Sequence, residues 1–191
     1  MKMVLRSAFL AMLLVCMQPG SLFAAEDEIE RAREYFTNLE LINQEGETVR
    51  FFDDVLKDKV VVINFIFTNC QGACPLMTFK LSQVRDQFEN QFGDPLQFVS
   101  LSIDPERDTP AAMKAFAQEH KADHEGWVWL TGNPDHLDTI IKRLGQFAED
   151  VESHSTMMLA GNVGAAHWMK IQPYEMPPQI AQKVALLLED G

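Results

Sequence analysis

The chain has 191 residues, 47% of them hydrophobic, so it is long enough for one globular domain with a sizeable core. Asp and Glu number 28 against 16 Lys and Arg, which gives a formal net charge of −12. This acidic balance, in a sequence without a Lys/Arg cluster, argues against nucleic acid and anionic lipid as partners.

The first 25 residues have the three parts of a secretory signal peptide. Two basic residues precede an apolar run over 7–17, and small residues follow at Ala24 and Ala25. The run is shorter than the roughly 20 residues that a membrane-spanning helix needs. We therefore expect residues 1–25 to direct export to the periplasm and to be cleaved. A retained N-terminal membrane anchor is the alternative.

Residues 26–38 are polar and compatible with a helix, and we take them as a lead-in segment to a single domain over residues 39–191. At the start of that domain, residues 39–51 form two short apolar stretches around a turn that ends in Gly46. This pattern predicts a β-hairpin that borders the main sheet.

The central stretch of the chain runs from an apolar strand into a cysteine pair. Residues 60–67 are almost all Val, Ile or Phe, which is typical of a strand covered on both faces. Cys70, Cys74 and Pro75 follow, and proline is favoured in a first helical turn. We predict that a helix extends from the cysteines to about Phe92, with both sulfurs on one helical face because they are four residues apart.

The rest of the chain continues as alternating strands and helices. We predict strands at 96–103 and 127–131, helices at 111–121 and 134–144, a hairpin with strands at 155–160 and 166–171 around a turn at 161–164, and a last helix at 178–188. We therefore predict a thioredoxin-like α/β fold with an N-terminal hairpin extension. One mixed sheet would be built from a βαβ unit, an inserted segment with further helices, and a final ββα unit.

The cysteine pair permits two kinds of chemistry. If residues 1–25 are removed, Cys70 and Cys74 are the only thiols left, and such a pair in an oxidising compartment is a disulfide, a redox pair or a metal clamp. A cysteine at a helix start has its thiolate stabilised, which suits both thiol exchange and metal binding. Redox enzymes of this fold usually carry two residues between the cysteines, whereas three lie between these, which leaves room for a metal.

His154 is the histidine that we expect to complete such a site. It lies directly before the strand of the last hairpin, at the loop where thioredoxins place a proline against their cysteines, and no proline occurs between Pro134 and Pro173. Two thiolates suit Cu(I), and an added imidazole lets a site also hold Cu(II) or Zn. We interpret the other histidines, at 120, 124, 136 and 167, as surface or packing residues.

These motifs together resemble the Sco/SenC family of thioredoxin-fold copper proteins, which help to build the binuclear copper site of cytochrome c oxidase. The resemblance covers roughly residues 39–188 and rests on Cys70-x-x-x-Cys74-Pro75, on the run from Ser102 to Pro110, on Leu130-Thr131-Gly132 and on His154-Ser155. It implies that Cys70, Cys74 and His154 are copper ligands. Family members usually have a proline directly after the first cysteine, whereas this chain has Gln71 there.

Within the run from Ser102 to Pro110 we expect a structural role, with Arg107 paired to Asp104 or Asp108 so that it braces the loop near the site. Of the consecutive residues Met157 and Met158, we expect one to face the core. Trp127, Trp129 and Trp168 are expected in the core or at its edge.

The leading hypothesis is thus a periplasmic copper-binding metallochaperone that receives copper from a donor and delivers it to a client cuproprotein, such as an oxidase subunit. The alternative is an enzyme, a thiol-disulfide oxidoreductase that cycles Cys70 and Cys74 and keeps a partner's cysteines reduced. A peroxidase ranks third, because the position of Thr68 does not match that family's spacing. A structural zinc site ranks last, because three ligands leave a tetrahedral site open.

Overall fold

The structure is a computed structural model that describes residues 20–146 and 156–190, with side chains from residue 26 onward. Its centre is a seven-stranded mixed sheet in the order β2-β1-β5-β4-β3-β6-β7. The strands are β1 (Glu40–Asn43), β2 (Thr48–Arg50), β3 (Val60–Ile66), β4 (Leu96–Ser102), β5 (Trp127–Thr131), β6 (Met158–Asn162) and β7 (His167–Ile171). The parallel trio β3, β4 and β5 forms the middle, and antiparallel strands extend it on both sides.

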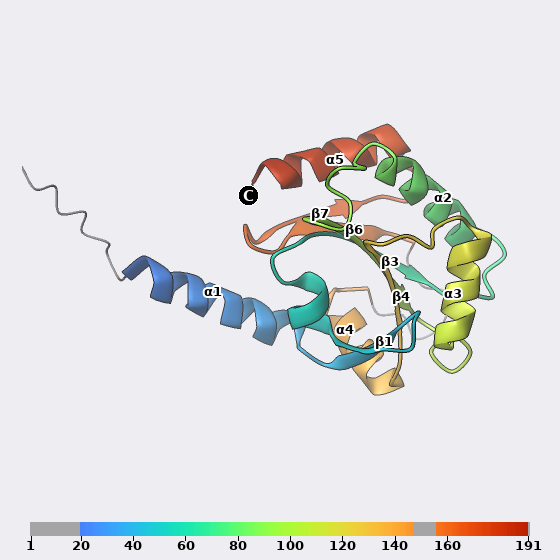
Figure 1. Ribbon diagram of the computed structural model, residues 1–191, viewed down its shortest axis with the longest axis horizontal. Coiled ribbons are helices and arrows are strands. Elements are labelled where there is room, and N and C mark those ends of the chain that lie inside the picture. Colours follow the sequence, from blue (N-terminus) through green and yellow to red (C-terminus); the bar gives the residue numbers. More distant parts are fainter. Residues whose placement is uncertain (1–19, 147–155, 191) are drawn as a thin grey trace, which may run out of the picture.

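Helices cover both faces of this sheet (Figure 1). One face is packed by α2 (Ala73–Arg85), α3 (Pro110–Glu119) and α5 (Pro177–Glu189). The other is packed by α1 (Gly20–Phe36), the π-helical turn η1 (Phe51–Leu56) and α4 (Pro134–Arg143). Among the described residues, no helix has the length and hydrophobicity to span a membrane.

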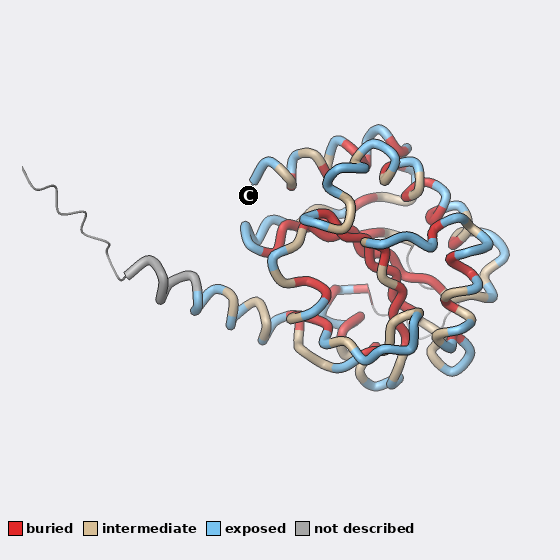
Figure 2. The backbone as a smooth tube through the Cα atoms, in the orientation of Figure 1, coloured by how far each residue is buried: buried red, intermediate tan, exposed pale blue. Residues whose placement is uncertain are grey.

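The β3 strand is buried from end to end because both of its faces meet a core. Val60, Val62 and Ile66 pack on the α2 side, whereas Val61, Ile63 and Phe65 pack on the opposite side. Figure 2 shows this continuous buried backbone in the middle of the molecule. The unbroken Val/Ile/Phe pattern therefore predicted the central strand correctly.

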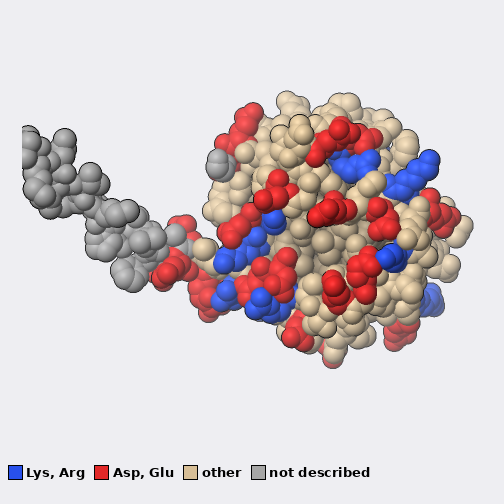
Figure 3. Space-filling view, in the orientation of Figure 1, with Lys and Arg blue, Asp and Glu red and all other residues tan. Residues whose placement is uncertain are grey.

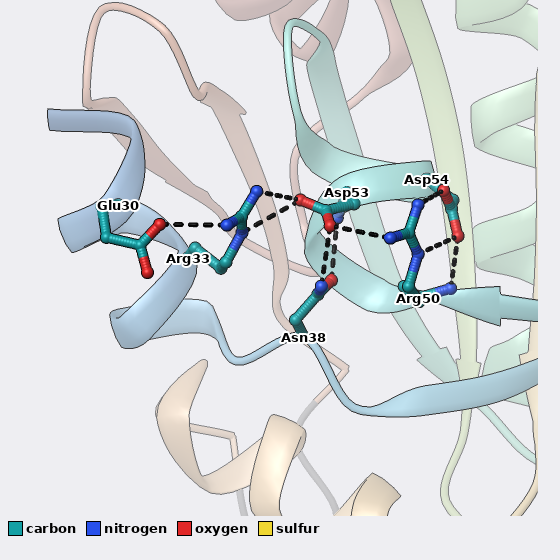
Figure 4. A network of polar contacts seen from close by, with 6 residues as sticks. All are labelled: Glu30, Arg33, Asn38, Arg50, Asp53 and Asp54. Carbon is teal, nitrogen blue, oxygen red and sulfur yellow. Dashed lines mark hydrogen bonds and ion pairs between the residues drawn. The ribbon is translucent and has the colours of Figure 1, made fainter. Parts of the chain in front are cut away.

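Most of the polar lead-in segment, residues 26–36, is the C-terminal part of α1, and side-chain contacts hold it against the rest of the domain. A network of polar contacts connects α1 to η1, and its members are Glu30, Arg33, Asn38, Arg50, Asp53 and Asp54 (Figure 4). Arg33 forms an ion pair with Asp53 at 2.8 Å, and the Asn38 amide donates to the same carboxyl group at 2.8 Å. The Phe36 ring, 4.9 Å from that of Trp168, adds an apolar contact with the sheet.

Two expected boundaries were wrong. The second helix ends at Arg85 rather than at about Phe92, because Gln87 and Phe88 form hydrogen bonds to carbonyl oxygens three residues earlier and the chain leaves the α-helical path. Phe88 and Phe92 are four residues apart, as on one face of a helix, but they pack against the core from the turns that follow α2.

The second error concerns the last hairpin. Gly161 and Asn162 were expected in the turn but belong to β6, where Gly161 pairs with Trp168 of β7. A Cβ atom at Gly161 would lie only 2.4 Å from the Trp168 ring, so this glycine marks a close approach of the indole and not a turn.

On the face shown in Figure 3, acidic side chains lie over the surface with basic ones interspersed. The basic side chains on this face lie beside acidic ones, which offsets their attraction for a polyanion.

Candidate functional site

The cysteine pair lies where β3 ends and α2 begins. The helix begins at Ala73, so Cys74 and Pro75 are in its first turn, as expected, while Cys70 belongs to the preceding loop. The expectation that both cysteines project from the helix is therefore wrong for Cys70. Its backbone amide donates to the Phe67 carbonyl at 3.1 Å, which turns the loop back toward the helix start.

This loop places the Cys70 sulfur at the N-terminus of α2. The Cys74 amide donates to Cys70 Sγ at 3.4 Å. The N-cap residue is Gly72, which has no side chain that could accept from this amide instead. The sulfur thus takes the place that a capping oxygen usually has at a helix start. Both cysteines are free thiols, with Cys70 half-buried and Cys74 only 2% exposed.

The two thiols have opposite acidities. Burial raises the pKa of Cys70, but hydrogen bonds from the Cys74 thiol and from the backbone amides at the helix start outweigh it, so the pKa is lowered overall. Burial is also the main reason that the pKa of Cys74 is raised to about 12, and its hydrogen bond to Cys70 and the nearby Asp108 charge act in the same direction. Cys70 is therefore the more acidic and more accessible thiol, and Cys74 is the buried, less acidic one.

Asp108 holds the loop before Cys70 in place. Its carboxyl group, only 1% exposed, accepts hydrogen bonds from the Thr68 amide at 2.9 Å, the Thr68 hydroxyl at 2.6 Å and the Ser102 hydroxyl at 2.6 Å. Arg107 was expected to pair with Asp104 or Asp108, and it pairs with Asp104 at 3.2 Å. The contact of Asp108, in the loop after β4, with Thr68, in the loop after β3, was not predicted from the sequence. It could have been, because neighbouring parallel strands such as β3 and β4 end at the same edge of the sheet.

His154, the expected third ligand, lies outside the described residues. The strand that follows it, β6, is antiparallel to β3, so the chain enters β6 at the end of the sheet where β3 leads to the cysteines. Within residues 20–146 and 156–190, no cluster of three or more His, Cys, Asp or Glu is arranged to hold a metal ion.

The remaining histidines have other contacts, as expected of surface or packing residues. His136 Nδ1 lies 2.8 Å from the Glu40 carbonyl, His124 Nε2 lies 3.0 Å from the Lys121 carbonyl, and His167 Nδ1 lies 2.5 Å from the Asp190 carboxyl group. The His120 ring packs 4.3 Å from that of Phe116.

The methionines and tryptophans are placed much as expected. Met158 is buried in the same core as Cys74, whereas Met157 is half-buried. Trp127 and Trp129 are stacked in that core at 5.4 Å, and Trp168 packs on the opposite face.

A large apolar groove lies at the other end of β3. It has a volume of about 770 Å³ and is lined by α1, by residues before β3 such as Lys57, by Val163 of the β6–β7 turn and by Trp168 of β7. The apolar residues of this groove belong to the sheet face packed by α1, η1 and α4, whereas Cys74 is buried on the opposite face. We therefore place the chemistry at the thiols and not in the groove.

Comparison with known proteins identifies the family of this chain. A model of the SCO1/SenC family matches residues 27–189. The SCO1 protein homolog of Bacillus subtilis (strain 168) is 36% identical over 90 residues, which are 47% of this chain and 45% of that protein. The chain spans about half the length of the curated relatives it matches.

Solved structures share the fold. A SCO1/SenC family lipoprotein from Bacillus anthracis str. Ames, 28% identical, superposes with a TM-score of 0.68 over 80% of this chain and 94% of that one. Arabidopsis thaliana ScoI with copper bound, 22% identical, gives a TM-score of 0.66 over 80% of this chain and 97% of that one, which shows likeness of fold. The expected thioredoxin-like fold is thereby confirmed, and since the family model matches nearly all of the described residues, the chain belongs to the SCO1/SenC family.

Proposed function

We propose that this protein binds copper through Cys70 and Cys74 and delivers it to a client cuproprotein, such as the binuclear copper site of cytochrome c oxidase. The observation that carries the proposal is the pair of free thiols at the start of α2, with one sulfur accessible and the other buried against it. Two thiolates form a soft donor set that Cu(I) prefers. A copper donor and a copper-receiving client are the partners that this role requires.

His154 is the third ligand in this proposal. Its imidazole supplies a nitrogen donor, which Cu(II) needs more than Cu(I) does. Because the raised pKa of Cys74 keeps its thiol protonated at neutral pH, copper binding must release that proton. Copper affinity therefore increases as the pH rises.

Export is part of the same proposal. Residues 1–25 act as a signal peptide for the periplasm or, if they are retained, as a membrane anchor. The B. anthracis relative is described as a lipoprotein, which supports a place outside the cytoplasm.

The test is a copper titration of the reduced protein without residues 1–25, in parallel with Cys70→Ser, Cys74→Ser and His154→Ala. We expect one equivalent of Cu(I) in the wild type, loss of tight binding in either serine variant, and an intense thiolate-to-Cu(II) absorption band that His154→Ala removes. Stoichiometric Cu(I) in a serine variant would contradict the proposal. His124→Ala serves as the matched control, because this exposed histidine contacts the Lys121 carbonyl away from the thiols.

A thiol-disulfide oxidoreductase is the second candidate function. The opposite pKa shifts favour it, since an accessible thiol with a lowered pKa followed by a buried thiol with a raised pKa matches an attacking and a resolving cysteine. In that reaction Cys70 attacks a partner disulfide, Cys74 then displaces the partner's thiol, and two electrons pass from the pair to the partner. Reductase activity that persists in His154→Ala, in a protein without stable copper, would favour this role.

A further inference from the structure

Four large apolar side chains stand exposed beside the candidate site, on α2 and on the loop between β7 and α5. The exposed fractions are 51% for Leu76, 58% for Phe79, 78% for Tyr174 and 57% for Met176. We call these four residues the apolar patch. Exposed apolar groups that gather in one place, in contrast to scattered ones, mark interaction sites.

Hydrogen bonds bring the two segments of the patch together. Lys80 of α2 is 7% exposed, and its ammonium group donates to the carbonyl of Pro173 at 2.7 Å and to that of Glu175 at 3.0 Å. Tyr174 lies between these two carbonyls in the chain, and Leu76 lies one helical turn before Lys80. The lysine therefore fixes the loop against the helix face that carries the patch.

Further contacts make this surface rigid. The Glu175 carboxyl group accepts a hydrogen bond from the Gln172 amide at 2.7 Å and pairs with Lys183 at 2.7 Å. The Met176 amide donates to the Gln179 side chain at 2.9 Å, which closes the start of α5. A surface that is already ordered loses little conformational entropy when a partner docks on it.

The patch adjoins the cysteines. Because β6 is antiparallel to both β3 and β7, the C-terminal ends of β3 and β7 lie at the same edge of the sheet. The first leads to Cys70 and the second to Tyr174, while Leu76 follows Cys74 by two residues. A macromolecule seated on the patch therefore lies at the end of the sheet that carries the thiols.

Charge and area indicate the kind of partner. The charged residues interspersed with the patch, Lys80 and Glu175, are both buried and bonded, so the patch presents no free charge in a chain of net charge −12. Its exposed area is about 500 Å², below the roughly 800 Å² per partner of a stable complex. Interfaces of this size are typical of brief encounters, such as those of redox partners, and not of a permanent dimer.

We propose that the apolar patch is the docking surface for the protein that receives copper from Cys70. This inference rests on the proposed function and adds to it the chemistry of the partner. The acceptor is a folded domain whose soft metal ligands are surrounded by exposed apolar side chains, and the encounter depends on apolar contact and not on charge pairing.

The test compares Phe79→Ser and Tyr174→Ser with Leu186→Ser as the matched control. Leu186 is also an exposed apolar residue on a helix, with 47% of its surface exposed. It lies at the opposite end of the sheet, since Asn162 donates to the Leu187 carbonyl and pairs with Val60 at the start of β3. The acceptor probe is the soluble copper domain of the oxidase subunit from the same organism.

The first measurement is an NMR titration of the reduced, metal-free protein with the metal-free acceptor domain. We expect amide shifts over residues 75–80 and 172–177, and an apparent Kd at least tenfold weaker in Phe79→Ser and Tyr174→Ser than in wild type or Leu186→Ser. Shifts confined to α1 or α4, or none with millimolar acceptor, would overturn the proposal. So would a dimer of the wild-type protein alone that Phe79→Ser dissociates, because the patch would then bind a second copy.

The second measurement separates docking from copper binding. Copper passes from the loaded protein either to the acceptor domain or to bicinchoninate, a small Cu(I) chelator that needs no docking surface. We expect Phe79→Ser to slow transfer to the domain about tenfold, to leave transfer to the chelator unchanged, and to leave copper content unchanged. Equal rates to the domain in all variants would refute docking at the patch. A wild type without bound copper would refute the proposed function, while the NMR result would still decide the docking surface.

Discussion

Replacement of Asp108 by Ala should be among the most damaging single changes near the site. The buried carboxyl group accepts three hydrogen bonds, two from Thr68 and one from Ser102. A hydrogen bond to a charged group contributes about 1.5–3 kcal/mol, and each buried donor left without a partner adds a further cost. Because alanine leaves three donors unpaired and a small cavity, we expect a loss of about 4 kcal/mol in the free energy of unfolding.

Asp108→Asn should cost less, about 1–2 kcal/mol, because the amide oxygen still accepts from Thr68 while its NH₂ group faces the Ser102 hydroxyl, which can accept. Guanidinium unfolding followed by circular dichroism measures both variants, with Glu106→Ala as the control, since that neighbouring side chain is exposed. A loss below about 1 kcal/mol for Asp108→Ala would refute the reasoning that these hydrogen bonds hold the loop.

Three further predictions concern packing, pH and reactivity. Gly161→Ala should lower the free energy of unfolding by about 2 kcal/mol, because the new methyl group displaces the Trp168 ring; an unchanged unfolding midpoint would contradict this close approach. Burial raises the pKa of Glu175, but its hydrogen bonds and ion pair outweigh burial and lower the pKa below 4.5 overall. The carboxylate therefore contributes its full stabilisation above pH 4.5, and this contribution is lost as the pH falls through the lower pKa of the folded state. Acid titrations of stability in wild type and Glu175→Gln should diverge in that window, and parallel curves would exclude the contribution. In the reduced, metal-free protein, the rate at which iodoacetamide modifies Cys70 should reach half its maximum below pH 9.0, whereas Cys74 should stay unmodified up to about pH 10. Mass spectrometry of the peptides measures both rates. Equal rates for the two cysteines would contradict their opposite pKa shifts.

Local sequence signals succeeded where one short-range effect decides the structure. Thr109 caps α3 through a hydrogen bond from the Ala112 amide, and Pro110 is the first helical residue, one position before the expected start at 111. Signals with two meanings failed. The glycine at 161 and the phenylalanines at 88 and 92 fit both a local pattern and a tertiary contact, and in this fold the tertiary contact determines their conformation.

By itself, the sequence determined that a buried strand leads to Cys70 and Cys74, that a helix follows, and that the chain folds as a thioredoxin-like α/β domain. Those features depend on hydrophobic period, proline and cysteine spacing, all of which are local. The tertiary structure alone decided that Cys70 lies outside the helix and that Cys74 is the buried thiol. It also decided that Asp108 holds the loop. Burial and hydrogen-bond partners set these properties, and they depend on which distant segments the sheet brings to the same edge.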